Sequence, residues 1–533
     1  MFAGLTLAGC SSDKPPASLV LDAHIYQNPN PTVPLAAILH IKTDEPTTVH
    51  IQVSGTAHPV HADFRASTTV HDIPVIGLAP GKTNSIVVTV ESAARRKETT
   101  TLTFDAPALP ADFPPLEILT SDPVSMEPGW TLFNVFQFDP QHAGVVVPMG
   151  WLVIVNAAGE VVWYHRPPVV PGEARQLSNG HLLYEYSHLG LVEIDMLGNA
   201  VAQWQAAALK TPVLPGATPV DTATMHHDMA QMPNGHFLTL STTAVMMSHY
   251  PTSEIDPEAP PGKATVIVDN VVEFDRKGTI VRTWDMSDML DLKRIGYDSS
   301  SPFWDVFYPG HAGGTKDWSH ANGIAYSEED DSIVVSLRNQ DAIVKFSRET
   351  GKLAWIFAPP ANWKSPWQEL LLSPASQLEW PYHQHAPKLG PNGKLLLFDN
   401  GNCRASPFEV RVPAEQNHSR VVEFRIDEAA KTVTQEWSYG GSDTEIFYSP
   451  FLGEGDWMPT TGNILVADGG HVVDEHGTPS DSIILGHKWA RIFEVTREDK
   501  PRKVFEIRIK AANTAGFGGW SIYRAERIPH LYP

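Results

Sequence analysis

Three histidines stand at matching positions in successive stretches of the chain. His227 precedes Asn234 by seven residues, and His385 precedes Asn392 by the same seven. His320 opens a similar stretch between them. Neutral imidazoles can act as nucleophiles, proton carriers and metal ligands near neutral pH. A single buried histidine more often serves the core, but three in register favour a shared site that carries out chemistry.

The residues beside these histidines distinguish two kinds of site. A histidine cluster most often binds zinc, iron or copper, and His383-Gln384-His385 fits a ligand pair. Arg338, however, ends the strand that follows His320, and a guanidinium would repel a metal ion. Arginine offers a planar fork of donors to a tetrahedral oxyanion, and Asn322 adds an amide. These residues favour an anion-binding site with neither metal nor cofactor.

Because side chains alternate between the two faces of a strand, the face of each residue next to these histidines can be predicted. His226 is expected to face away from His227. Asn322 and His383 should each share the face of the histidine two residues away, and we expect both to bind substrate.

A repeated hairpin indicates how the chain positions these residues. Residues 192–204 and 272–284 match position for position, each running from a strand through a glycine turn to a tryptophan. Looser copies lie at residues 154–163, 344–355, 422–437 and 492–505. A lone hairpin cannot bury its apolar face and must stack on others. These repeats predict an all-β fold with a six-bladed β-propeller.

A second hairpin element alternates with the first and completes each blade. Its turns are Leu177–Gly180, Met232–Gly235, Gly390–Gly393 and Thr460–Asn463. The strand-like segment 520–527 is expected to complete the first blade and close the ring. Because the innermost strand of a blade borders the central channel, residues at one phase of neighbouring inner strands should converge near the axis.

The N-terminal part has a different pattern. Apolar runs separated by Pro- and Thr-rich turns predict a small β-sandwich of the fibronectin-III type over residues 18–111. The Pro-rich stretch 106–115 is interpreted as a linker, and the catalytic propeller is expected over residues 112–533. Residues 1–17 are interpreted as the remnant of an export signal.

Composition narrows the partners. The chain has 61 Asp and Glu against 39 Lys and Arg, a formal charge of −22. With no basic run to interrupt this acidity, nucleic acid is excluded as a partner. Cys10 follows Leu7-Ala8-Gly9 as in a bacterial lipoprotein signal, which predicts lipidation, a periplasmic location and an outer-membrane anchor. Cys403 then has no intramolecular partner. A homodimer is compatible with the sequence.

Four short motifs carry a family resemblance. They are His227-Asp-Met, Trp318-Ser-His-Ala-Asn-Gly323, Ser336-Leu-Arg-Asn-Gln340 and Gln384-His-Ala-Pro387. In this order, and on repeated blades, they resemble the bacterial arylsulfate sulfotransferase family. The resemblance implies a ping-pong enzyme that moves a sulfuryl group from a phenolic sulfate ester to a phenol, without a nucleotide donor.

The resemblance also implies residue roles. His385 would become the sulfohistidine, while His227, His320, Asn322 and Arg338 would bind the transferring group. Aromatic residues would flank the aryl rings; the candidates are Tyr184, Tyr186, Phe303 and Trp304.

One departure from the family and two alternatives remain. Family members carry a close cysteine pair, whereas Cys403 stands alone. A metal-dependent propeller enzyme of the lactonase or oxygenase type, or a non-catalytic envelope scaffold, would use the same histidines differently.

Overall fold

The structure, a computed structural model, describes residues 18–138, 150–208, 213–311, 313–441, 444–482, 486–510 and 518–532. The expected signal segment, with Cys10, lies outside the described residues. The chain forms two compact units, Met1–Pro29 with Leu35–Ala108 and Asn30–Pro34 with Leu109–Pro533. Among the described residues, no helix has the length and apolar character needed to cross a membrane.

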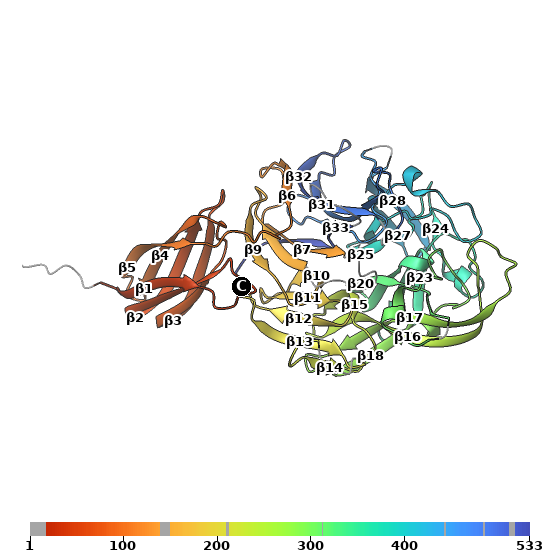
Figure 1. The fold of residues 1–533 in the computed structure, drawn as a ribbon, viewed down its shortest axis with the longest axis horizontal. Coiled ribbons are helices and arrows are strands. Elements are labelled where there is room, and N and C mark those ends of the chain that lie inside the picture. The colour runs from red at the N-terminus through yellow and green to blue at the C-terminus, as the bar shows by residue number, and fades with distance from the viewer. Residues whose placement is uncertain are drawn as a thin grey trace, which may run out of the picture. The chain divides into compact units, whose positions relative to one another are not determined.

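The first unit is a five-stranded sheet (Figure 1). Its strands are β1 (Val20–Gln27), β2 (Ala37–Ser54), β3 (Val60–Val75), β4 (Thr83–Ser92) and β5 (Lys97–Asp105). Strand β2 pairs along one edge with β3, and along the other with β1 in its first half and β4 in its second. Alternate β2 residues such as Leu39, Ile41 and Ile51 are fully buried, so one face of the strand forms the core.

The second unit is a ring of six blades (Figure 1). Four sheets each form one blade, and a ten-stranded sheet contains both the first and the last blade. The first blade has β7 (Trp130–Phe138), β8 (Gly150–Val155), β9 (Val161–His165), β33 (Gly518–Ser521) and β34 (Ala525–Ile528). The second has β10 (Pro171–Gln176), β11 (Leu182–Tyr186), β12 (Gly190–Ile194), β13 (Ala200–Ala206) and β14 (Thr218–Val220).

The third and fourth blades follow the same plan. The third has β15 (His226–Gln231), β16 (Phe237–Tyr250), β17 (Gly262–Phe274), β18 (Ile280–Asp285) and β19 (Thr315–Asp317). The fourth has β20 (Ala321–Ser327), β21 (Ser332–Leu337), β22 (Ala342–Ser347) and β23 (Leu353–Phe357). Three short 3-10 helices, η2 (Met286–Asp288), η3 (Phe303–Val306) and η4 (Arg338–Gln340), lie in their loops.

The fifth and sixth blades complete the ring. The fifth has β24 (Ser373–Pro374), β25 (His385–Gly390), β26 (Lys394–Asp399), β27 (Arg420–Asp427) and β28 (Thr432–Tyr439). The sixth has β29 (Glu454–Trp457), β30 (Ile464–Val473), β31 (His487–Val495), β32 (Lys503–Ile509) and β6 (Leu116–Ser121). Two 3-10 helices, η5 (Trp367–Leu370) and η6 (Ala414–Gln416), lie in the surrounding loops. The predicted propeller is thereby confirmed.

Tryptophans at the ends of the repeated hairpins join neighbouring blades. In the first three blades the tryptophan donates its indole N–H to the hairpin turn of the next blade: Trp163 to the Met196 carbonyl, Trp204 to that of Arg276, and Trp284 to that of Arg348. These indoles are buried, so each bond satisfies a polar group that would otherwise be costly inside the protein.

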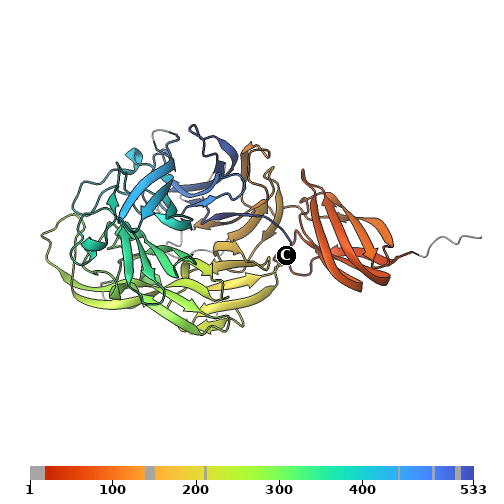
Figure 2. The same cartoon turned by 180° about the vertical axis from the view of Figure 1, so that it is seen from behind.

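Both ends of the propeller chain close the ring. As expected from the sequence, β33 and β34 pair with β7 in the first blade. Strand β6 also joins the last blade by pairing with β32, which the hairpin repeat did not predict. Figure 2 shows from behind that the C-terminal strands in blue lie beside the orange strands from the start of the propeller.

An ion pair at this closure provides a stability test. Arg527 donates to Glu494 at 2.9 Å and both side chains are almost fully buried, whereas Arg508 and Glu117 form a partly exposed pair at 2.6 Å. Arg527→Leu leaves a buried carboxylate without its cation and should lower the free energy of unfolding by about 3 kcal/mol. Arg508→Leu should change it by less than about 1 kcal/mol. The midpoints of denaturant unfolding measure the change in stability of both variants. Equal shifts in the two variants would contradict the larger contribution expected of the buried pair.

Candidate active site

Three neighbouring inner strands begin with the same backbone irregularity. Register shifts interrupt β15, β20 and β25 at their first residues. His227 (φ 59°) and Ala386 (φ 52°) within these shifts, and His320 (φ 46°) directly before β20, are left-handed, which is uncommon for residues other than glycine. Bulges re-aim side chains and are frequent beside active sites. The repeated irregularity brings the His227 and His320 rings to 4.8 Å between centroids.

His385 is held in one orientation by Asn400. The Asn400 side-chain N–H₂ donates to the carbonyls of Ser449 (2.8 Å) and Leu452 (2.7 Å), so its oxygen must face the imidazole. That oxygen lies 2.6 Å from Nδ1 of His385. Since an amide oxygen only accepts, Nδ1 carries the proton and Nε2 keeps its lone pair. Burial, with Arg338 nearby, sets the pKa of His385 well below 6.5. The ring is therefore neutral, the form in which an imidazole can act as a nucleophile.

His320 is paired with a carboxylate. Its Nδ1 lies 2.5 Å from Oδ2 of Asp317, and the other Asp317 oxygen accepts the indole N–H of Trp304 at 2.9 Å. The carboxylate is thus fixed, and it orients the imidazole so that Nε2 can exchange a proton with a ligand.

His227 lies in a stack of imidazoles. Its ring is stacked on that of His188 with centroids 4.6 Å apart, and its Nδ1 lies 2.7 Å from Nδ1 of His226. The prediction that His226 and His227 face opposite ways is therefore wrong, because the bulged, left-handed backbone at His227 breaks the strand alternation. Burial and the neighbouring imidazoles hold the pKa of His227 well below 6.5.

Arg338 and Asn322 both belong to the surroundings of His385, Asn322 through a bond to the preceding residue and Arg338 through its charge. Arg338 Nη1 donates to Asp298 (3.2 Å) and to the Asn339 side chain (2.9 Å). Asn322 is fully buried and donates to the carbonyl of Gln384 at 2.9 Å, while its own side-chain oxygen has no partner. Asn322 therefore supports the backbone next to His385, and Arg338 supplies a cation.

Two of the four aromatic candidates contact the histidines. Phe303 lies edge-on to His320 with centroids 4.8 Å apart, and Trp304 packs against His226 at 4.9 Å. Tyr184 packs against His165 instead, and the Tyr186 hydroxyl donates to Gln205 at 3.4 Å inside its own blade. Phe303 is half-buried beside the histidines, so its ring is the one placed to meet a substrate.

Family models decide the affiliation of the chain. Residues 148–520, which include all the site residues above, match the model described as Arylsulfotransferase (ASST). Residues 24–107 match the Arylsulfotransferase Ig-like domain. The chain belongs to the arylsulfotransferase family. The resemblance drawn from the motifs is confirmed, and the first unit is the family's Ig-like domain.

Named relatives in this family match over part of their length. The chain is 31% identical over 229 residues to arylsulfate sulfotransferase AssT of Escherichia coli O6:H1, covering 35% of this chain and 37% of that protein. It is 28% identical over 255 residues to AssT of Lelliottia amnigena, covering 40% and 42%. Thus each alignment spans less than half of the relative. The structure of Pseudomonas aeruginosa periplasmic gluconolactonase PpgL shows 10% identity and a TM-score of 0.32 over 74% of this chain and all of that one, too low to support an argument.

Sequence reasoning missed several residues of this arylsulfotransferase site. Asn400 and Asp317 orient two of the histidines, and His188 extends the imidazole stack. Arg524, almost fully buried, joins Asp228 (3.0 Å) to the Asn322 carbonyl (2.9 Å). Only weak signals for them are present in the sequence. Asn400 comes shortly after the apolar run Leu395–Phe398, and Asp317 lies three residues before His320.

The oriented Asn400 predicts a pH effect. If His385 acts as a nucleophile, its neutral form is the active one, and activity should decline only as the pH falls well below 6.5. Asn400→Asp places a carboxylate against Nδ1, which stabilises the imidazolium and raises the pKa of His385. The acidic limb of kcat/KM should then move to higher pH. Asn402→Asp adds the same charge two residues along and should leave the limb in place; identical limbs in both variants would refute the assigned orientation.

Proposed function

We propose that the protein is an aryl-sulfate sulfotransferase in which His385 carries the sulfuryl group between a phenolic sulfate ester and a phenol. The orientation of His385 by Asn400 supports this most directly, because it leaves the Nε2 lone pair free on a ring that lies close enough to Arg338 to feel its charge. Family membership supports the same reaction class.

The first half-reaction transfers the group to the protein. Nε2 of His385 forms a bond to sulfur while the bond from sulfur to the aryl oxygen breaks, and the electron pair leaves with the phenolate. His320, oriented by Asp317, gives that oxygen a proton. In the second half-reaction the incoming phenol loses its proton to His320, attacks sulfur, and returns the electron pair to Nε2.

The surrounding donors stabilise the transferring group. Sulfuryl transfer resembles phosphoryl transfer, in which a loose transition state spreads charge over the peripheral oxygens. Fixed donors aimed at those oxygens act before the reaction begins and need no reorganisation. Arg338 fits this role, and the low pKa of His227 keeps its imidazole neutral, so it can accept or donate a hydrogen bond without adding charge.

Initial-rate kinetics test the function. The protein, without any nucleotide, is incubated with a chromogenic phenyl sulfate and a second phenol while both concentrations are varied. Release of the chromophore that rises with acceptor, with parallel double-reciprocal lines, is expected for a ping-pong transferase. Intersecting lines would contradict the covalent intermediate, and the absence of release over a panel of aryl sulfates would contradict the function.

A further inference from the structure

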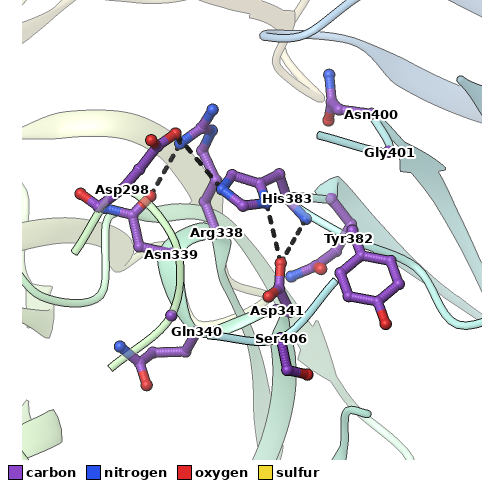
Figure 3. A network of polar contacts seen from close by, with 12 residues as sticks. Asp298, Arg338, Asn339, Gln340, Asp341, Tyr382, His383, Asn400, Gly401 and Ser406 are labelled. Carbon is purple, nitrogen blue, oxygen red and sulfur yellow. Dashed lines mark hydrogen bonds and ion pairs between the residues drawn. The ribbon is translucent and has the colours of Figure 1, made fainter. Parts of the chain in front are cut away.

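His383 lies next to the nucleophile but is enclosed by charged side chains (Figure 3). It precedes His385 by two residues, its side chain is fully buried, and its backbone is left-handed (φ 53°). The strand begins only at His385, so strand alternation does not apply to His383. The partners of its ring are protein groups on other loops.

Two carboxylates face the two ring nitrogens. Nδ1 lies 3.0 Å from Oδ1 of Asp341, and Nε2 lies 3.5 Å from Oδ2 of Asp298. Neither nitrogen has a hydrogen bond of good alignment, so the attraction is ionic. A neutral imidazole would leave a buried ring without partners between two negative charges, whereas an imidazolium gives both carboxylates a counter-charge.

One of these carboxylates also contacts the arginine of the site. Asp298 Oδ2 accepts from Nη1 of Arg338 at 3.2 Å (Figure 3). Asp298 is held in place because its backbone N–H donates to Glu254 at 3.2 Å and its carbonyl accepts from Asn339 at 3.2 Å. Asp341 follows the η4 turn that carries Arg338 and accepts the backbone N–H of His383 at 2.9 Å. The four charged groups form one connected network.

The charge of this network depends on His383. With a neutral ring, Asp298 and Asp341 would carry two negative charges against the single positive charge of Arg338, which pairs with Asp298. With a charged ring, the two cations balance the two anions. We propose that His383 is a positioning residue, a buried imidazolium that neutralises Asp298 and Asp341 so that Arg338 stays available to the transferring group. The same contacts tie the segment that carries His385 to the turn that carries Arg338.

The ionisation of the network agrees with this arrangement. Burial and the Arg338 charge oppose protonation of His383, but Asp341 and Asp298 outweigh them and raise its pKa to about 9. The Asp298 side chain is 46% exposed, so its partial burial opposes ionisation only in part, and contacts with His383 and Arg338 hold the pKa of Asp298 well below its usual range. Asp298, Asp341 and Arg338 are the charged groups that face the ring.

A charge-balance experiment separates positioning from substrate contact. This test rests on the proposed function and measures release of the aryl group in a single turnover, without acceptor. His383→Gln should reduce the single-turnover rate of aryl release by about 10- to 100-fold, the usual effect of losing an orienting partner. Adding Asp298→Asn removes the carboxylate that then holds Arg338 and should restore at least about tenfold. If the loss of activity in the double variant equals the product of the losses in the two single variants, the proposal is overturned. His236→Gln, which removes a histidine paired with Glu273 in the third blade, is the control and should leave the rate unchanged.

A second readout does not depend on sulfuryl transfer. The folded-state pKa of about 9 lies above the ordinary value of 6.5, so the charge on His383 stabilises the fold fully below pH 6.5, and this stability is lost as the pH rises through 9. Relative to His383→Gln, the wild-type denaturation midpoint should therefore fall between pH 6.5 and 9.5. Parallel curves would overturn the proposal even if transfer is observed. A wild type that shows this loss but releases no aryl group would refute the proposed function and leave the buried charge established. If His383→Gln does not fold, Asp298→Asn is compared with the wild type instead. Because this variant removes one of the carboxylates that raise the pKa of His383, its stability should decline at a lower pH than that of the wild type, and identical pH profiles would overturn the proposal.

Discussion

Replacing His385 by alanine should abolish sulfuryl transfer. The imidazole supplies the only covalent step of the proposed reaction, and covalent catalysts deprived of their nucleophile lose activity on the order of 10⁴-fold or more in kcat. The measurement is steady-state release of a chromogenic phenol at saturating donor and acceptor. The fold should be unaffected, because the side chain is oriented by one hydrogen bond to Asn400.

A matched histidine provides the control for this variant. His236 lies nine residues after His227 in the same blade and pairs with Glu273 at 2.7 Å, away from the imidazole cluster. His236→Ala should retain near wild-type turnover. Comparable losses in both variants would mean that the effect arises from folding, and a His385→Ala variant with substantial activity would exclude it as the sulfuryl carrier.

Replacing Arg338 by alanine should have the next largest effect. Removing one preorganised donor from a charged transition state costs about 10²- to 10³-fold in kcat. Arg338→Lys keeps the charge but loses the planar fork, so its rate should lie between those of the wild type and the alanine variant. Added guanidinium ion should partly restore the alanine variant and should have no effect on the lysine variant.

The exposed Arg166, which pairs with Asp112 at 2.7 Å, supplies a control for Arg338. Arg166→Ala removes the same charge from the protein and should leave kcat within about twofold, because an exposed pair contributes little. If Arg338→Ala behaves like Arg166→Ala, the guanidinium has no part in transfer.

The sequence revealed the repeated parts of the molecule. Hairpins that end in Trp204 and Trp284 recur because every blade must bury the same face, so their spacing predicts the propeller. The spacing of His227 and His385 likewise indicates a shared site, although in the structure His226 has the place at the start of β15 that His385 has at the start of β25, and the residue that matches His227 is Ala386. Repetition is visible without coordinates, and for this reason both predictions were possible.

The partners of the site residues were not visible in the same way. Asn400 is fifteen residues from His385 and reaches it across a strand pair, and its orientation depends on two carbonyls about fifty residues away. The position of His226 was predicted wrongly because strand alternation assumes regular backbone, whereas His227 is left-handed. Such features arise from local irregularity, which composition and periodicity do not encode.

The central claim is that His385 carries the sulfuryl group, and trapping that group tests it most directly. The protein would be mixed with an aryl sulfate in the absence of acceptor, quenched, digested and examined by mass spectrometry. The account predicts a sulfuryl-mass adduct on the peptide that contains His385, lost on addition of a phenol and absent from His385→Ala. Turnover without any adduct, or an adduct on another residue that disappears with phenol, would contradict it.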